Sequence, residues 1–154
     1  MSFFTKKSVN EHKTIDLNKL MRLAGEVEES ATDGLVSAES MEELSADLGV
    51  PQEQLYAGLG MAGSASMKLE HDVAFVVCTG GCQGSGALAC VSELLNLRDD
   101  LVDEGSAAFD VIPAHCLNRC QSAPVVEVRS DDGTAVLAKA TPESLTEAVG
   151  ELFD

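Results

Sequence analysis

Four cysteines in two close pairs constrain this chain more than any other feature. The first pair, Cys78 and Cys82, lies in VVCTGGCQGSGALAC, and the second pair, Cys116 and Cys120, lies in PAHCLNRCQSAPVVEV. Each pair sits in a short loop that follows a run rich in apolar and β-branched residues. Because such runs are typical of buried strands, the sequence predicts two strand ends that bring four thiols to one place.

Two kinds of metal site can be built from this pattern. A 2Fe-2S cluster needs four thiolates, two on each iron, which two loops with a close cysteine pair supply. The first loop also contains Gly80, Gly81, Gly84 and Gly86, which let backbone N–H groups approach the cluster sulfides closely. A structural zinc ion accepts four thiolates as well, although its pairs favour the tighter Cys-x-x-Cys. The spacing therefore favours the cluster and leaves zinc as the alternative.

Other reactive residues have simpler interpretations. A thiol–disulfide oxidoreductase would need Cys-x-x-Cys at a helix start, and neither loop has it. Cys90 lies eight residues after Cys82 in a helical stretch, where it is best interpreted as a small buried residue. The alternative is that Cys90 replaces Cys82 as a ligand. His115 adjoins Cys116, but the Cys-x-His arrangement of Rieske centres is absent, so we expect an exposed side chain.

Composition and motifs exclude several classes of function. The chain has 10 Lys and Arg against 26 Asp and Glu, a formal charge of −16, which a nucleic acid backbone would repel. No apolar run approaches the roughly 18 residues of a membrane-spanning helix. Neither a Gly-x-Gly-x-x-Gly after a strand nor a Walker loop is present, and no catalytic triad stands out. We expect a non-catalytic, cytoplasmic protein that does not insert into a membrane.

The first part of the chain predicts a helical region. Residues 1–14 are polar and aperiodic and are interpreted as a flexible arm. Residues 15–66 form the predicted docking region. The spacing of apolar residues predicts three helices in it, near 15–29, 37–48 and 51–59. Ser37 is the expected N-cap of the second helix, and Pro51 suits the first turn of the third. The small residues GMAGSAS at 60–66 predict a linker.

Residues 67–154 carry a different pattern. Strand-like runs at 73–77 and 109–113 flank a helical stretch at 86–98. Two further strands at 125–128 and 135–138 are separated by Ser-Asp-Asp-Gly, a hairpin signal. Thr141-Pro142 opens a last helix. The order βαβ-ββα predicts an α/β fold of thioredoxin-like type, with a mixed sheet whose first two strands are parallel.

The cysteine loops resemble those of a known family. VVCTGGCQGSGA is similar to the first loop, and CLNRCQSAPVVEV to the second loop, of the thioredoxin-like 2Fe-2S ferredoxins. The stretch GLVSAESMEELSADLGVPQEQLYAGL resembles the helical N-terminal region of the small thioredoxin-like subunit of NADH dehydrogenase (complex I). That subunit type also occurs in NAD-linked hydrogenases and formate dehydrogenases. The chain departs in one place, having three residues between its first two cysteines where the family's subunit form has four.

The resemblance implies a specific role. Cys78, Cys82, Cys116 and Cys120 would be the ligands of one 2Fe-2S cluster, with Gly86, Ala123 and Pro124 at structural positions around it. The chain would be an electron-transfer subunit, and its partner a flavoprotein subunit that carries FMN and binds NAD(P). A ferredoxin that shuttles alone between partners is the alternative, although it would not need the helices of residues 15–60.

Overall fold

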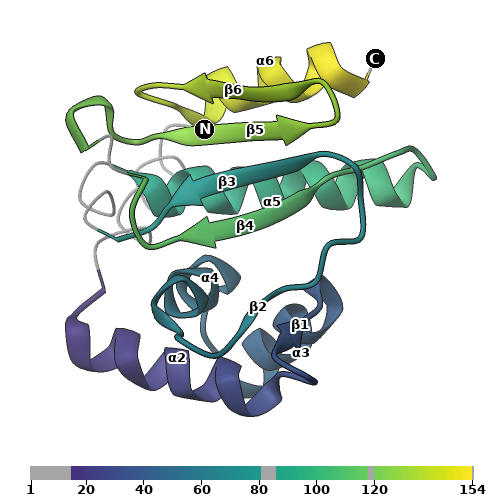
Figure 1. Cartoon of the computed structure of the whole chain (residues 1–154). Coiled ribbons are helices and arrows are strands. Elements are labelled where there is room, and N and C mark those ends of the chain that lie inside the picture. Colours follow the sequence, from purple (N-terminus) through teal and green to yellow (C-terminus); the bar gives the residue numbers. More distant parts are fainter. Residues whose placement is uncertain (1–14, 81–85, 118–119, 154) are drawn as a thin grey trace, which may run out of the picture.

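A four-stranded mixed sheet organises the C-terminal part of the protein. The computed structural model describes residues 15–80, 86–117 and 120–153, so the predicted arm at 1–14 lies outside the described residues. The strands occur in the spatial order β4-β3-β5-β6, and the helices α5 and α6 pack against each other behind the sheet (Figure 1). Their bounds are β3 (Ala74–Cys78), α5 (Ala87–Asp103), β4 (Asp110–Ala114), β5 (Val126–Ser130), β6 (Gly133–Leu137) and α6 (Pro142–Phe153).

The predicted α/β fold, its element order and its strand directions are confirmed. β3 is buried along its whole length and runs parallel to β4, with β5 antiparallel on its other side. A central strand covered on both faces needs a continuous apolar sequence, which AFVVC supplies. The hairpin also forms as predicted, with Ser130 paired to Gly133 across the turn and β6 antiparallel to β5. The last helix is capped by Thr141, whose side-chain oxygen accepts from the Ser144 N–H at 3.1 Å.

Three helices precede the sheet. They are α2 (Leu17–Ser30), α3 (Ala38–Leu48) and α4 (Gln52–Met61). Ser37 caps α3 as predicted, and Gly49 ends it in the left-handed conformation with φ of 68°. Pro51 lies at the N-cap of α4, one residue before the first turn in which the sequence predicts it. Prolines are most favoured at the first helical position, which Gln52 occupies here.

A second, small sheet was not predicted from the sequence. β1 (Leu35–Val36) and β2 (Ser66–Met67) pair in parallel. The linker predicted at 60–66 is confined to residues 62–65, because Gly60 and Met61 continue α4 and Ser66 begins β2. Two-residue strands carry too little periodicity to be recognised, and Met67 becomes buried where it pairs with Val36.

Some apolar residues lie outside the core that periodicity predicts. Helical spacing places Leu48 of α3 and Leu152 of α6 on the apolar faces of their helices, but the two side chains are 38% and 48% exposed. Each lies in the last turn of its helix, where fewer neighbouring elements cover the side chain. None of the helices in the described ranges is long and apolar enough to cross a bilayer.

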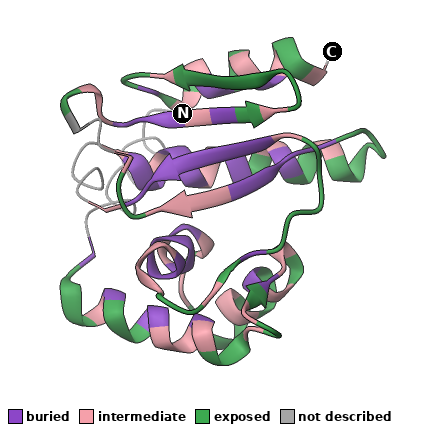
Figure 2. Ribbon diagram, in the orientation of Figure 1, coloured by how far each residue is buried: buried purple, intermediate pink, exposed green. Residues whose placement is uncertain are grey.

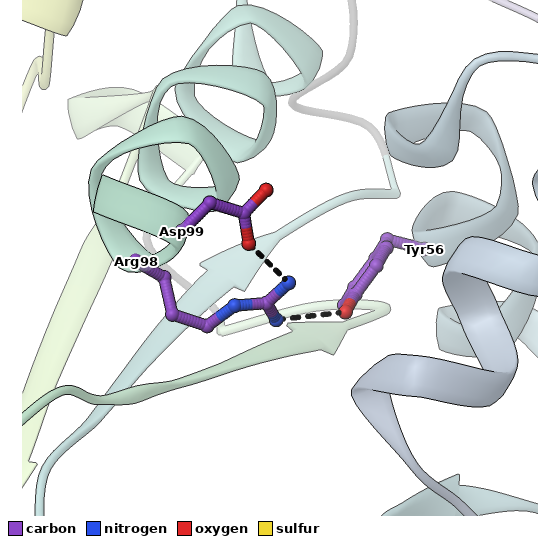
Figure 3. A network of polar contacts seen from close by, with 3 residues as sticks. All are labelled: Tyr56, Arg98 and Asp99. Atoms are coloured by element: carbon purple, nitrogen blue, oxygen red, sulfur yellow. Dashed lines mark hydrogen bonds and ion pairs between the residues drawn. The ribbon is translucent and has the colours of Figure 1, made fainter. Parts of the chain in front are cut away.

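Helix α4 joins the N-terminal helices to the sheet domain. It packs against α2 on one side and against β4 and α5 on the other (Figure 1). At this junction the fully buried Tyr56 accepts a hydrogen bond of 3.4 Å from Nη1 of Arg98, which is 5% exposed. The guanidinium also donates to Asp99 at 3.2 Å through Nη2 (Figure 3). Burial raises the pKa of Tyr56, so the phenol is neutral beside the charged guanidinium.

Candidate metal centre

Cys78 is held firmly by the sheet. It is the last residue of β3, pairs with Ala114 of β4, and is 3% exposed. On the opposite side its backbone N–H donates to the carbonyl of Val125 at 3.3 Å. The next residue, Thr79, donates its N–H to the Ala114 carbonyl at 2.7 Å. The first cysteine is therefore fixed between its two neighbouring chain segments before the loop begins.

Cys116 approaches the same point from the neighbouring strand. It follows the last residue of β4 by two positions and is exposed to solvent. The thiol of Cys78 donates to the carbonyl oxygen of His115, with a sulfur–oxygen distance of 3.7 Å. Because β3 and β4 are parallel neighbours, their carboxyl ends deliver Cys78 and the segment that carries Cys116 to the same edge of the sheet.

Two glycines of the first loop have observable roles. A Cβ on Gly80 would overlap the carbonyl oxygen of His115, so the two cysteine loops are in direct contact there. Gly86 has φ of 100° at the N-cap of α5, and a Cβ on it would lie 3.9 Å from Cγ of Pro124. The approach of the loop N–H groups to cluster sulfides stays a prediction. Gly81 and Gly84 fall outside the described residues.

The full set of four ligands stays a prediction. Cys82 lies outside the described residues, and for Cys120, which begins the short 3-10 helix η2 (Cys120–Ser122), only the backbone is described. Within the described ranges no three His, Cys, Asp or Glu side chains are grouped as a metal site would require. The described part nevertheless fits a cluster, because two loops that each bear a cysteine pair touch at Gly80 and His115.

The remaining candidates behave as the sequence predicts. Cys90 is 1% exposed, and its thiol donates to the Ala140 carbonyl at a sulfur–oxygen distance of 3.7 Å. Burial raises the pKa of Cys90 to about 11. This confirms Cys90 as a small buried residue. His115 is exposed, also as expected.

Sequence reasoning missed the part that α4 plays at this site. A Cβ on Gly60, in the last turn of α4, would lie 2.6 Å from Oγ1 of Thr79 and 3.7 Å from the backbone N of His115. Helix α4 therefore touches both cysteine loops. The only signal in the sequence was a glycine within a helical pattern, which was interpreted as the start of a linker.

The chain is similar to solved structures of one kind of ferredoxin but matches no family model. No protein-family model matches the chain, and no curated protein does. Two solved structures of a thioredoxin-like 2Fe-2S ferredoxin from Aquifex aeolicus are similar to it. One is 20% identical, with a TM-score of 0.44 over 53% of this chain and 80% of the ferredoxin chain. The other is 21% identical, with a TM-score of 0.43 over 53% and 85%. A likeness at this level carries no argument for a shared function.

Proposed function

We propose that this protein is an electron carrier that holds one 2Fe-2S cluster on Cys78, Cys82, Cys116 and Cys120. The observation that carries the proposal is the contact between the two cysteine loops at the ends of two parallel strands. Each loop contains two cysteines separated by three residues. Four thiolates can therefore converge, which is the ligand set of a 2Fe-2S cluster.

The chain's own residues suit this task in two ways. When bound, the cluster supplies the reversible uptake of one electron. Cys78 is buried and fixed by β3, so it anchors the inner side of the site. Cys116 is exposed, so the outer side of the site is open to a partner. An electron carrier needs this arrangement, because its cluster must be held rigidly and still be approached closely.

The proposal extends to the partner. We infer that the protein is a subunit of an NAD(P)H-linked oxidoreductase complex and exchanges electrons with a flavoprotein subunit that carries FMN. The resemblance of residues 34–59 to the N-terminal region of the complex I subunit supports this assignment. So does the position of α4, which touches the cysteine loops at Gly60. Leu17 and Met21, one helical turn apart on α2, are 61% and 58% exposed and offer an apolar surface for docking.

Iron analysis and spectroscopy of the purified protein test the cluster. We expect about two irons and two sulfides per chain, visible absorption that bleaches on reduction, and an electron paramagnetic resonance signal in the reduced state. Cys78→Ser, Cys82→Ser, Cys116→Ser and Cys120→Ser should each lower the iron content strongly. Cys90→Ala is the matched control and should keep iron and colour. A colourless protein with one zinc per chain would refute the proposal in favour of the structural zinc site.

Affinity purification from the native source tests the partner separately. A subunit should retain a flavoprotein that contains FMN and oxidises NADH or NADPH. Exchange of both Leu17 and Met21 for Ser should weaken this retention without reducing the iron content. A cluster-loaded protein that purifies alone would be a shuttle ferredoxin, and the subunit assignment would fail while the cluster assignment stands.

A further inference from the structure

A pocket at the start of β4 has no part in the proposed function. It lies between the first turns of α3, the connection from β2 to β3, the last two turns of α5 and the first residue of β4, and its volume is about 440 Å³. This volume is within the usual range for ligand-binding pockets. Asp110, which lines this β4 pocket, lies four residues before Ala114, the partner of Cys78, or about 13 Å along the strand (Figure 1). The β4 pocket and the cysteine loops are therefore at opposite ends of the sheet.

The β4 pocket is negatively charged. Its lining contains one guanidinium and one imidazole but five carboxylates, those of Glu39, Glu42, Glu70, Asp99 and Asp110. The guanidinium belongs to Arg98 and donates to Tyr56 and Asp99 (Figure 3). Among the described ion pairs none involves Glu39, Glu42 or Glu70, and all three are exposed. The β4 pocket therefore favours a cationic occupant.

Asp110 is a buried residue with one free carboxylate oxygen. It is 5% exposed, and its Oδ2 accepts the backbone N–H groups of Glu70 at 2.9 Å and His71 at 3.1 Å. These bonds tie the buried start of β4 to the exposed residues that precede β3 (Figure 2). Oδ1 accepts no hydrogen bond from any residue that the structure describes. The fully enclosed side-chain oxygens without a partner in the described ranges belong to Gln52 and Gln54, so Oδ1 is accessible from the pocket that Asp110 lines. A donor placed in the pocket would complete its hydrogen bonding.

An apolar wall adjoins these charges. Val102 of α5 is 53% exposed, Ala38 of α3 is half-buried, and both line the β4 pocket. A long side chain with a charged end can lay its methylene groups along such a wall while its charge reaches the carboxylates. The combination suits lysine, which has a four-carbon stem and a compact ammonium.

We propose that the β4 pocket binds a lysine side chain of a partner protein, whose ammonium donates to Oδ1 of Asp110. The three donors of an ammonium suit a single buried oxygen with separate carboxylates around it. An arginine fits less well, because its planar guanidinium prefers both oxygens of one carboxylate and Oδ2 already accepts two backbone N–H groups. A metal ion fits less well, because no three ligating side chains are grouped in the described ranges.

Charge also decides which kind of partner can supply this lysine. A second copy of the chain has a formal charge of −16 and would be repelled, so the partner is a different protein with a basic segment. Because the β4 pocket and the cysteine loops lie at opposite ends of the sheet, such a partner can hold this chain and leave the loops accessible. The inference does not depend on the proposed function, since no residue of the pocket is a cysteine.

A nuclear magnetic resonance titration of the isotope-labelled full chain, with whatever metal its cysteines hold, tests the proposal. The probe is the peptide acetyl-Gly-Lys-Gly-amide, and the control peptide has norleucine in place of lysine, which keeps the stem and removes the charge. The lysine peptide should shift the amide signals of Glu70 and His71, because their N–H groups bond to Asp110. Since one side chain provides the contact, we expect a dissociation constant of about millimolar order. The norleucine peptide should shift neither signal.

Asp110→Asn is the most specific variant. The amide oxygen can still accept the two backbone N–H groups, while the amide NH₂ replaces Oδ1 and presents donors where the ammonium needs an acceptor. The fold should be kept, and the affinity for the lysine peptide should fall at least about tenfold. Glu43→Gln is the matched control, because it removes one exposed charge of α3 that does not line the pocket. It should change the affinity by less than about twofold.

Val102→Lys blocks the β4 pocket without altering Asp110. The position is exposed, so the fold should be kept, and the introduced ammonium competes with the peptide. The affinity for the lysine peptide should fall about fivefold or more. This variant decides the test if Asp110→Asn lowers the thermal midpoint of unfolding.

Three results would overturn the proposal. The first is an absence of shifts at Glu70 and His71 with the lysine peptide. The second is an unchanged affinity in Val102→Lys, or in an Asp110→Asn protein that keeps the wild-type thermal midpoint. The third is binding of putrescine more than about tenfold tighter than the lysine peptide, which would assign the pocket to a free polyamine instead of a protein side chain.

Discussion

The sulfur of Cys78 lies 3.7 Å from the carbonyl oxygen of His115, 37 residues further along the chain. This contact joins the end of β3 to the segment that leads directly into Cys116. The parallel pairing of β3 with β4 produces it, because both strands end at the same edge of the sheet.

The contact between the two cysteine loops should not tolerate a side chain at Gly80. Gly80→Ala would place a methyl group onto the backbone carbonyl of His115, which cannot move aside as a flexible side chain would. We expect the loops to separate and the iron content per chain to fall several-fold, measured together with the visible absorption. Gly63→Ala is the control, because a Cβ there meets nothing within 4 Å. Equal iron content in the two variants would contradict the importance of this contact.

Two helical glycines should respond to alanine with opposite signs. Gly58 of α4 faces α2, and a Cβ on it would lie 2.9 Å from the Cβ of Leu23 and 3.1 Å from the backbone N of Ala24. Gly58→Ala should therefore lower the unfolding free energy by about 1–3 kcal/mol. Gly25→Ala in α2 meets nothing within 4 Å and should raise it by about 0.5–1 kcal/mol, from helix propensity alone. Urea unfolding followed by circular dichroism measures both, and changes of the same sign would show that α2 and α4 do not pack as described.

The hydrogen bond between Arg98 and Tyr56 should contribute more to the unfolding free energy than the neighbouring ion pair between Arg98 and Asp99. Tyr56→Phe removes the acceptor of a buried guanidinium and should cost about 1–3 kcal/mol of unfolding free energy. Asp99→Asn should cost less than about 1 kcal/mol, because the Asp99 side chain is 51% exposed and its charge is screened by water. Chemical denaturation of the two variants compares them directly. A larger loss for Asp99→Asn would refute this ranking.

Cys90 should make stability depend on alkaline pH. Its folded-state pKa of about 11 lies above the ordinary value of 9.0 because burial disfavours the thiolate. A raised pKa contributes stability that is fully present below pH 9 and is lost as the pH rises from 9 toward 11. The stability advantage of the wild type over Cys90→Ala should therefore shrink over this range, by up to about 2 kcal/mol. Thermal midpoints of both proteins, measured at steps of pH, test this, and a constant difference would contradict it.

Local chemistry explains why much of this fold could be predicted. The all-apolar run before Cys78, the Ser-Asp-Asp-Gly turn and the Thr141-Pro142 cap each act within a few residues, and each forms where the sequence predicts. The order of strands and helices predicts that β3 and β4 are parallel neighbours. Because a cysteine pair follows each of these strands, the sequence also predicts that the two cysteine loops meet. The linker predicted at 60–66 is longer than the connection in the structure, residues 62–65, for the complementary reason. Small residues were interpreted as flexible, although Gly60 is small because it lies against Thr79.

By itself the sequence determined which segments become the longer helices and strands, where the cysteine pairs fall, and that Cys90 is buried. Only the tertiary structure decided that α4 reaches both cysteine loops, that β1 pairs with β2, and that Arg98 is buried against Tyr56. The physical reason is the distance along the chain over which each kind of interaction acts. Periodicity, caps and turns depend on neighbours within one or two turns of chain, whereas these contacts join segments about 20 to 55 residues apart, whose meeting depends on how whole elements pack.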